Sequence, residues 1–255
     1  MVLSGTEDCA DLYPRGMYLN SHQLLEPSQE RLRILSETFD AGLRNLILVN
    51  SVCGGTGSGF THSLIQNVSD EYEKAGIMNV CIYPEQGSET LGVYNTILSF
   101  DYTLANSAVN LVIDNKAVRG MGGKGVSRWD NQVICNLLKD ILYNQTSVNS
   151  LAQILVPFPR HKFIIPHLQK IPLLSLTNPS QPPKYQSVQI TEELDLINTP
   201  SFGDALGIIT NQCEKNYNKG LYHHWYVSAG MELREITDAI YHCQNIVHEY
   251  NSPTE

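Results

Sequence analysis

The sequence is poor in charged residues and contains no long hydrophobic run. Only 17% of its 255 residues are Asp, Glu, Lys or Arg, and the formal net charge is −9. An acidic chain has little attraction for nucleic acid or for an anionic membrane surface, so we expect neither as a main partner. No stretch is apolar for long enough to predict a membrane span. The segment from Met1 to Leu12 lacks both a basic and an apolar part, so we predict no signal peptide.

Motifs for disulfides and for metal ions are also missing. The six cysteines are scattered, none forms a CxxC pair, and most lie in apolar runs, as reduced buried thiols do. His242 and His248 are six positions apart, which places them on different faces of a helix. The acidic residues between positions 192 and 204 lack the spacing and the central glycine of a calcium loop. We therefore predict no metal site made by the protein itself.

What the sequence does contain is a regular alternation of strand and helix signals. Hydrophobic residues make up 42% of the chain, which is enough to bury a core. Apolar runs predict strands at residues 46–52, 79–83 and 109–114, and apolar residues spaced three or four apart predict helices at 60–72, 94–104 and 131–142. This order predicts an α/β fold, with a parallel sheet covered on both faces and a ligand site at the carboxyl ends of its strands.

The remainder of the chain divides into two further parts. Residues 156–200 are rich in proline, with a predicted strand at 162–165 and a predicted loop at 178–184. Residues 201–255 return to a helical pattern, and the last predicted helix has its apolar residues three or four positions apart: Leu233, Ile236, Ile240, Cys243, Val247 and Tyr250. We predict domain boundaries at residues 155 and 200.

A glycine-rich run lies between the first predicted strand and the helix that follows it. Residues 53–59 read CGGTGSG. Glycines let backbone N–H groups approach a phosphate, the helix N-terminus adds its dipole, and Thr56 and Ser58 can donate hydroxyl hydrogen bonds. The alternative is a tight turn in which glycines only permit close packing. The run has neither the lysine of a P-loop nor the pattern of a dinucleotide-binding loop.

The run resembles the tubulin signature G-G-G-T-G-S-G, with Cys53 in place of the first glycine. Other segments resemble eukaryotic-type tubulin in the same order along the chain: residues 13–16 (YPRG), 83–84 (YP), 94–95 (YN), 113–115 (IDN), 156–160 (VPFPR), 224–226 (HWY) and 230–231 (GM). The resemblance implies a partial GTP-binding domain at 1–155, a remnant of the intermediate domain at 156–200 and C-terminal helices at 201–255.

The resemblance also implies a guanine-nucleotide site for GTP or GDP, with Mg²⁺ held only through the nucleotide. Asp11 stands where the family has an asparagine near the phosphates, and Ser88 stands in the ribose-side loop. Asn115 and Asn131 would contact the guanine edge, although each asparagine alone also fits a helix cap or a turn. The implied nucleotide-binding residues are Asp11, Ser51, Gly54, Gly55, Thr56, Gly57, Ser58, Ser88, Asn115 and Asn131.

Several departures from the family pattern bear on activity. The family's first strand and first phosphate loop have no counterpart, which would leave two sheet edges unpaired. Gly92 stands where the family has a ribose-binding glutamate, and residues 160–222 are too few for a complete intermediate domain. Ser150 stands where alpha-type tubulin has its water-activating glutamate, and a lone serine is not a base at neutral pH. We expect no catalytic residue, weakened nucleotide binding and loss of hydrolysis.

Three functions fit these observations. The first is a guanine-nucleotide-binding structural constituent of microtubules, located in the cytoplasm and cytoskeleton, with tubulin subunits as partners. The second is a non-polymerising interaction protein that binds tubulin or its chaperones. The third is a truncated product without a stable fold.

Overall fold

The computed structural model describes residues 2–38, 42–83, 90–122, 128–143, 147–168, 171–174 and 186–252. Ser88 and the loop expected at 178–184 lie outside these ranges. The strands are β1 (Asn45–Ser51), β2 (Gly76–Tyr83), β3 (Val109–Asp114), β4 (Phe163–Leu168), β5 (Ile171–Pro172), β6 (Gln186–Gln189) and β7 (Leu194–Asn198). The helices are α1 (Ser21–Glu37), α2 (Thr61–Glu71), α3 (Thr90–Asn106), α4 (Asn115–Gly122), α5 (Arg128–Tyr143), α6 (Val148–Leu155), α7 (Ser201–Asn218), α8 (His223–Ser228) and α9 (Leu233–Asn251), with π-helical turns η1 (Arg15–Asn20) before α1 and η2 (Thr56–Phe60) before α2.

One sheet organises the described chain, with the strand order β1-β2-β3-β4-β7-β6. Strands β1 to β4 run parallel to one another, while β7 pairs antiparallel with both β4 and β6, and β5 pairs antiparallel with β4. Strands β2 and β3 are buried along almost their whole length. Such burial on both faces explains why these strands are continuous apolar runs rather than alternating ones. The predicted α/β fold with a mainly parallel sheet is confirmed.

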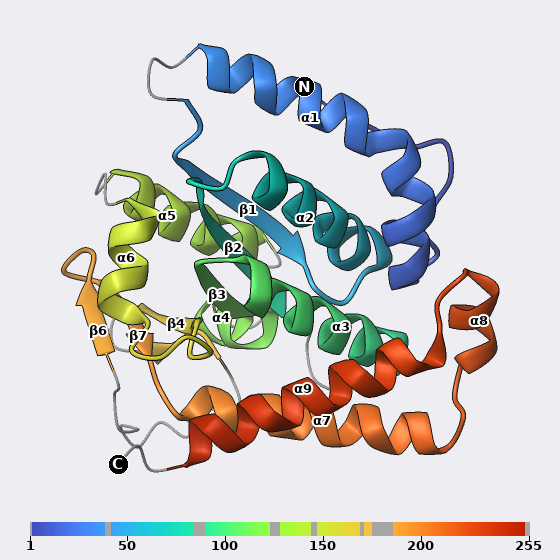
Figure 1. Cartoon of the computed structure of the whole chain (residues 1–255). Helices are drawn as coiled ribbons and strands as arrows, with labels where there is room; N and C mark the ends of the chain where they lie inside the picture. Colours follow the sequence, from blue (N-terminus) through green and yellow to red (C-terminus); the bar gives the residue numbers. More distant parts are fainter. Residues whose placement is uncertain are drawn as a thin grey trace.

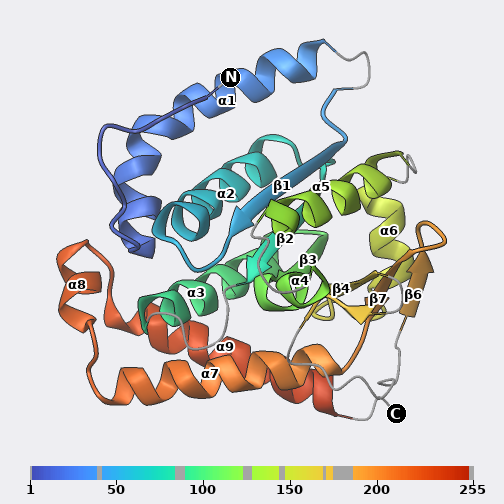
Figure 2. The same cartoon turned by 180° about the vertical axis from the view of Figure 1, so that it is seen from behind.

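Helices cover both faces of the sheet (Figures 1 and 2). On one face, Cys81, Val112 and Phe163 pack with the side chains of α3, α7 and α9. On the other face, alternate residues such as Val80 and Leu111 pack with α5 and α6. Helix α2 packs beside β1 and β2, and α1 lies outside α2 in both views. None of the described helices is long and apolar enough to cross a membrane.

Helices α7 and α9 pack against each other through a cluster of aromatic side chains. The rings of Phe163 and Phe202 are stacked with centroids 4.4 Å apart, and Tyr250 packs edge-on against Phe202. The Tyr250 hydroxyl accepts a hydrogen bond from the Phe163 backbone N–H at 3.2 Å. A capping box formed by Glu232 and Glu235 begins α9. The predicted last helix therefore forms with its apolar stripe buried.

The sheet passes without a break through the first predicted domain boundary. Strand β3 pairs with β4 at Asn110↔Phe163 and Leu111↔Ile164, so the chain after residue 155 extends the same sheet. The proline-rich segment supplies strands β4 to β7, more strand than the single one predicted at 162–165. The three-part division therefore remains a prediction about ancestry rather than a visible separation of cores.

Candidate functional site

The glycine-rich run connects the carboxyl end of β1 to η2 and α2. The Val52 N–H donates to the Ile82 carbonyl at 3.2 Å, which keeps the chain beside β2 one residue past the strand. The helix then begins at Thr56, with Gly55 as its N-cap residue and no side-chain cap. The first amides of a helix have no partner within that helix, so this arrangement turns N–H groups toward the strand end. The predicted strand–loop–helix geometry is present.

Three of the loop glycines lie against the protein's own backbone. A Cβ atom on Gly55 would stand 2.6 Å from both the backbone N and the backbone O of Leu12. A Cβ atom on Gly57 would stand 2.3 Å from the Ser51 carbonyl oxygen. A Cβ atom on Gly59 would stand 2.0 Å from the Tyr13 carbonyl oxygen. No side chain fits at these distances. Close packing, the alternative weighed for these glycines, therefore accounts for Gly55, Gly57 and Gly59.

Gly54 differs from the other loop glycines because its environment is open. The atom closest to a Cβ built on it is an Asp11 carboxylate oxygen, at 3.9 Å. The structure thus brings Asp11 close to Gly54 at the carboxyl end of β1, although they are far apart in the sequence, and we call the open space beside Gly54 the gap. Ser51 is exposed at the end of β1, and its hydroxyl oxygen lies 3.1 Å from the Cys53 sulfur. Among the described residues, this open side of Gly54 is where a ligand phosphate could approach the loop.

The segment that carries Asp11 forms a strained turn against the loop. Ala10 and Asp11 have φ values of 48° and 53°, and the Leu12 N–H donates to the Cys9 carbonyl at 3.0 Å. These features define a type I′ β-turn, in which alanine is an unfavourable residue. The contacts at Gly55 hold this turn in place, so the loop and the turn depend on each other.

The hydroxyl groups of the loop are used within the protein. Ser58 is buried, and its hydroxyl donates to the Gly54 carbonyl at 2.6 Å. This differs from the expectation that Ser58 donates to a phosphate, because a hydroxyl has one proton to give. Thr56 is exposed, and its hydroxyl donates to the Cys9 sulfur at 3.1 Å. The same sulfur accepts a hydrogen bond from the Asn20 amide at 2.8 Å.

The residues implied for the guanine edge lie farther along the sheet. Asn115 directly follows β3 and is the first residue of α4, half-buried at the same edge of the sheet as the loop. The preceding Asp114 is buried and accepts a hydrogen bond from the Lys116 N–H at 2.7 Å. Asn131 lies near the start of α5 and is exposed. Asn115 is therefore positioned by the strand end, whereas Asn131 lies on the exposed surface of α5.

Ser150 lies in the first turn of α6 and is exposed. Its backbone N–H donates to the Ser147 hydroxyl oxygen at 3.1 Å, and the two hydroxyl oxygens are 3.0 Å apart. Ser147 is the helix N-cap, so this contact has an ordinary structural purpose. Within the described chain, no group of three or more His, Cys, Asp or Glu side chains is arranged to hold a metal ion.

A half-buried histidine lies behind the loop at the start of α2. The His62 ring stacks on Tyr102 with centroids 3.3 Å apart, and its Nδ1 is paired with the Tyr13 hydroxyl. Burial lowers the pKa of His62 to about 3, so the ring is neutral at physiological pH. The Tyr13 pKa is raised, chiefly by burial, so the phenol keeps its proton. The pair is a neutral hydrogen-bonded support beneath the segment that packs on Gly59.

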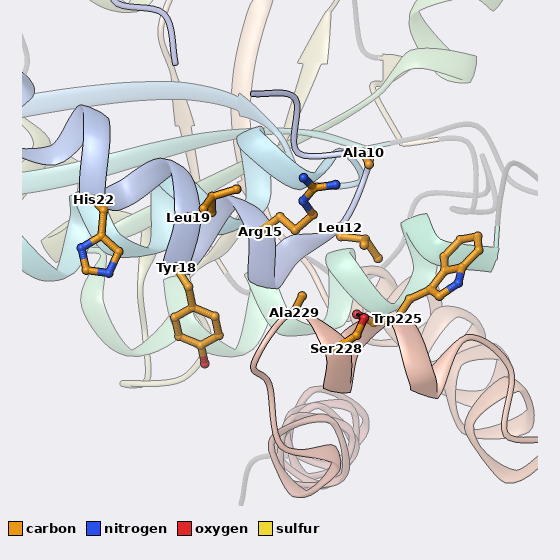
Figure 3. A pocket seen from close by; sticks show the side chains of 9 residues that line it. All are labelled: Ala10, Leu12, Arg15, Tyr18, Leu19, His22, Trp225, Ser228 and Ala229. Atoms are coloured by element: carbon orange, nitrogen blue, oxygen red, sulfur yellow. Dashed lines mark hydrogen bonds between the residues drawn. The ribbon is translucent and has the colours of Figure 1, made fainter. Parts of the chain in front are cut away.

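A cavity of about 670 Å³ lies beside the Ala10–Asp11 turn. Figure 3 shows that its lining comes from the turn, from η1 and the start of α1, and from α8. Trp225 of α8 and Leu19 of η1 are 40% and 37% exposed there. Arg15 and His22 contribute the basic side chains of a lining that is otherwise largely apolar or aromatic: Ala10, Leu12, Tyr18, Leu19, Trp225, Ser228 and Ala229.

One residue at the site has a role that the sequence pattern did not suggest. Asn95 of α3 is completely buried and donates to the backbone carbonyls of Asp11 and Cys53, each at 2.7 Å. Its place in a tubulin-like YN pair was the available signal. The partners, however, come from segments that only the fold brings together.

Comparisons with known proteins agree with this geometry. Residues 1–123 match the model of the Tubulin/FtsZ family, GTPase domain. The Tubulin alpha-1B chain of Schizophyllum commune is 30% identical over 189 residues, which cover 68% of this chain and 42% of the relative. The Tubulin alpha chain of Dictyostelium purpureum is 32% identical over 179 residues, covering 64% of this chain and 54% of the relative. The chain thus spans about half the length of the curated relatives it matches.

Proposed function

Because the chain is a divergent, alpha-like member of the tubulin family, we propose that it binds a guanine nucleotide at the loop and acts through contacts with tubulin subunits. The proposal rests on the open space beside Gly54, next to the Asp11 carboxylate at the carboxyl end of β1, and on a helix N-terminus that has no side-chain cap. The phosphates would lie in this gap, and Asn115 would face the base from the end of β3. GTP and GDP are the expected ligands, and Mg²⁺ enters with the nucleotide.

The loop fits a phosphate only in part. Its open face and helix amides favour an anion, whereas the Asp11 carboxylate adds a negative charge where the family has an asparagine. The Ser58 hydroxyl donates its proton to the Gly54 carbonyl, so backbone N–H groups would supply most of the hydrogen bonds to the phosphates. These features support weak binding that depends on a cation to offset Asp11.

A nucleotide titration tests this proposal. Fluorescent GTP should bind saturably to the wild-type chain in the presence of Mg²⁺. Asp11→Asn should bind about tenfold more tightly or better, because it removes a like charge near the phosphates. Gly54→Leu should abolish binding while leaving the unfolding temperature nearly unchanged, because the space beside Gly54 is open. A folded wild-type chain that does not bind the nucleotide would contradict the proposal.

We propose that the chain does not hydrolyse the nucleotide. Ser150 lacks a carboxylate that could accept a proton from water, and its hydroxyl lies against Ser147. Ser150→Ala should therefore leave the rate of phosphate release unchanged and at background. The control is Ser150→Glu, which restores the acid. The Val148 N–H of the same helix donates to Asn45 at the amino end of β1, so this acid would lie at the edge of the sheet opposite the loop, and the isolated chain should still release phosphate only at background.

The cavity beside α8 favours the second function, an interaction protein that binds tubulin. Trp225 and Leu19 expose apolar surface around a hollow, and aromatic residues of this kind anchor many protein interfaces. We propose tubulin subunits as partners, in the cytoplasm and at the cytoskeleton. Trp225→Ala should reduce co-sedimentation with microtubules or co-elution with free tubulin. Co-sedimentation would support a polymer constituent, and co-elution alone would support the non-polymerising role.

A further inference from the structure

The amide of Asn95 is bonded at all four of its hydrogen-bonding positions. Its nitrogen donates to the carbonyls of Asp11 and Cys53, each at 2.7 Å. Its oxygen accepts from the Tyr13 N–H at 3.1 Å and from the Tyr226 hydroxyl at 2.7 Å. An asparagine amide has two N–H donors and room for two acceptor contacts, so every position is used. Aspartate cannot replace it, because a carboxylate has no proton to donate to the two carbonyls.

Two of these bonds hold opposite walls of the phosphate gap. Cys53 directly precedes Gly54 on the loop, and Asp11 belongs to the strained turn that faces Gly54. Helix α3 also touches the loop directly, since a Cβ on Gly92 would stand 3.2 Å from the Cys53 Cβ. The width of the gap therefore depends on the position of the Asn95 amide.

The fourth bond connects the gap to the far end of the chain. Tyr226 is completely buried in α8, and its ring packs edge-on against Tyr94 with centroids 5.4 Å apart. Its neighbour Trp225 lies on the exposed side of the same helix and lines the cavity beside the turn. One short helix thus contacts Asn95 on its inner side and the cavity on its outer side.

We infer that Asn95 is the positioning residue of the phosphate loop and that the Tyr226 hydroxyl holds its amide in place, so that the position of α8 and nucleotide binding are linked. The inference rests on the proposed nucleotide site for its functional meaning, but the loop can be observed without a nucleotide. A displacement of α8 would weaken the Tyr226–Asn95 bond and loosen both walls of the gap. Nucleotide binding would in turn favour the position of α8 seen here.

Tyr226→Phe tests the link, because it removes one hydroxyl and keeps the buried ring. The rate of alkylation of Cys53, measured by mass spectrometry of its peptide, should rise severalfold. The exposed Cys135 serves as the reference for the reagent, and the buried Cys213 of α7 serves as the reference for global unfolding. A purely structural defect would raise the rates at Cys53 and Cys213 together. The linked mechanism raises the rate at Cys53 alone.

Tyr94→Phe is the matched control. It also removes one tyrosine hydroxyl from the same cluster, but that hydroxyl donates to the Leu221 carbonyl at 3.2 Å. Its Cys53 rate should stay within about twofold of wild type. Equal Cys53 rates in the two variants would overturn the inference, as would parallel increases at Cys53 and Cys213 in Tyr226→Phe.

The nucleotide measurement separates this inference from the proposed function. Where wild type binds fluorescent GTP, Tyr226→Phe should bind roughly three- to tenfold more weakly, the range expected for one neutral hydrogen bond. Unchanged affinity would overturn the functional link. Where wild type binds no nucleotide, the proposed function fails, and the alkylation rates still decide whether Asn95 and Tyr226 position the loop.

Discussion

The phosphate loop and the C-terminal helical layer are packed by opposite means. In the loop, backbone lies on backbone, and Gly55, Gly57 and Gly59 leave no room for a methyl group. In the layer of α7 and α9, large side chains such as Phe202 and Tyr250 fill the space between the helices and the sheet. The loop therefore depends on the absence of side chains, and the layer depends on their volume. The two regions should therefore fail under different substitutions.

The largest expected effect comes from adding one methyl group to the loop. Gly59→Ala would place a Cβ 2.0 Å from the Tyr13 carbonyl oxygen, so the backbone must move. We expect a loss of more than about 4 kcal/mol in the free energy of unfolding, measured with urea. The control is Gly54→Ala, whose added Cβ meets only Asp11 at 3.9 Å and should change stability by less than about 1 kcal/mol. Equal losses of unfolding free energy in Gly59→Ala and Gly54→Ala would contradict the close backbone contact assigned to Gly59.

A slightly smaller effect is expected from removing volume in the helical layer. Phe202→Ala would remove a buried ring that contacts Phe163, Phe100 and Tyr250, at a cost of about 3–5 kcal/mol. Phe202→Leu keeps most of the volume and should cost less than half as much. A layer that depended on exact ring geometry, rather than on volume, would lose similar stability in both variants.

Lowering the pH should reduce the free energy of unfolding through His62 on the loop side, by less than the two substitutions above. Burial holds the pKa of His62 at about 3 against an ordinary value of 6.5, so the unfolded chain binds more protons below pH 6.5. The contribution of His62 is therefore complete above pH 6.5 and is lost as the pH falls toward 3, with ~2 kcal/mol lost by pH 5. Urea titrations of wild type and His62→Asn should show a flatter pH dependence in the variant.

His161 also contributes to the pH dependence of the unfolding free energy, so the titration of wild type alone does not isolate the effect of His62. Burial also lowers the pKa of this histidine, which packs against Tyr250 in the helical layer. Its contribution is lost in acid with the same sign. The difference between wild type and His62→Asn isolates the loop side, and identical slopes between pH 7 and pH 5 would contradict the role assigned to His62.

The smallest expected effect concerns an ion pair at the edge of the helical layer. Arg160 contacts Glu249 of α9 at 2.7 Å, with the side chains 57% and 37% exposed. Exposed pairs contribute little, so Arg160→Ala should lower the free energy of unfolding by less than about 1 kcal/mol. The loss should shrink further in high salt. A larger, salt-independent loss would indicate that the aliphatic part of Arg160 packs the layer.

The sequence was most informative where local pattern and burial agree. Strands β2 and β3 are covered on both faces, so their continuous apolar runs are visible without a structure. The regular spacing in α9 predicts its buried stripe for the same reason. The antiparallel strand β6 was not predicted, because it is short and mostly exposed and its residues follow no apolar alternation. Strand β7 was not predicted either, although it is mostly buried, because it is only five residues long.

The candidate site was predictable in location but not in construction. A strand, a glycine run and a helix are adjacent in the sequence, so the loop could be found from its letters. The contacts that explain Gly55 and Gly59 come from the segment containing Leu12 and Tyr13, which no local pattern connects to them. The same holds for Asn95, whose importance lies in partners that only the tertiary structure brings near.

The parallel pairing of β1, β2 and β3 has a consequence for how the molecule folds. Each pair must wait for an intervening helix to bring distant segments together, whereas α7 and α9 are separated by a short helix and can meet early. The loop at Gly54 forms only when β1 is docked beside β2. During refolding, the amides of α7 and α9 should therefore gain protection from hydrogen exchange before those of the phosphate loop.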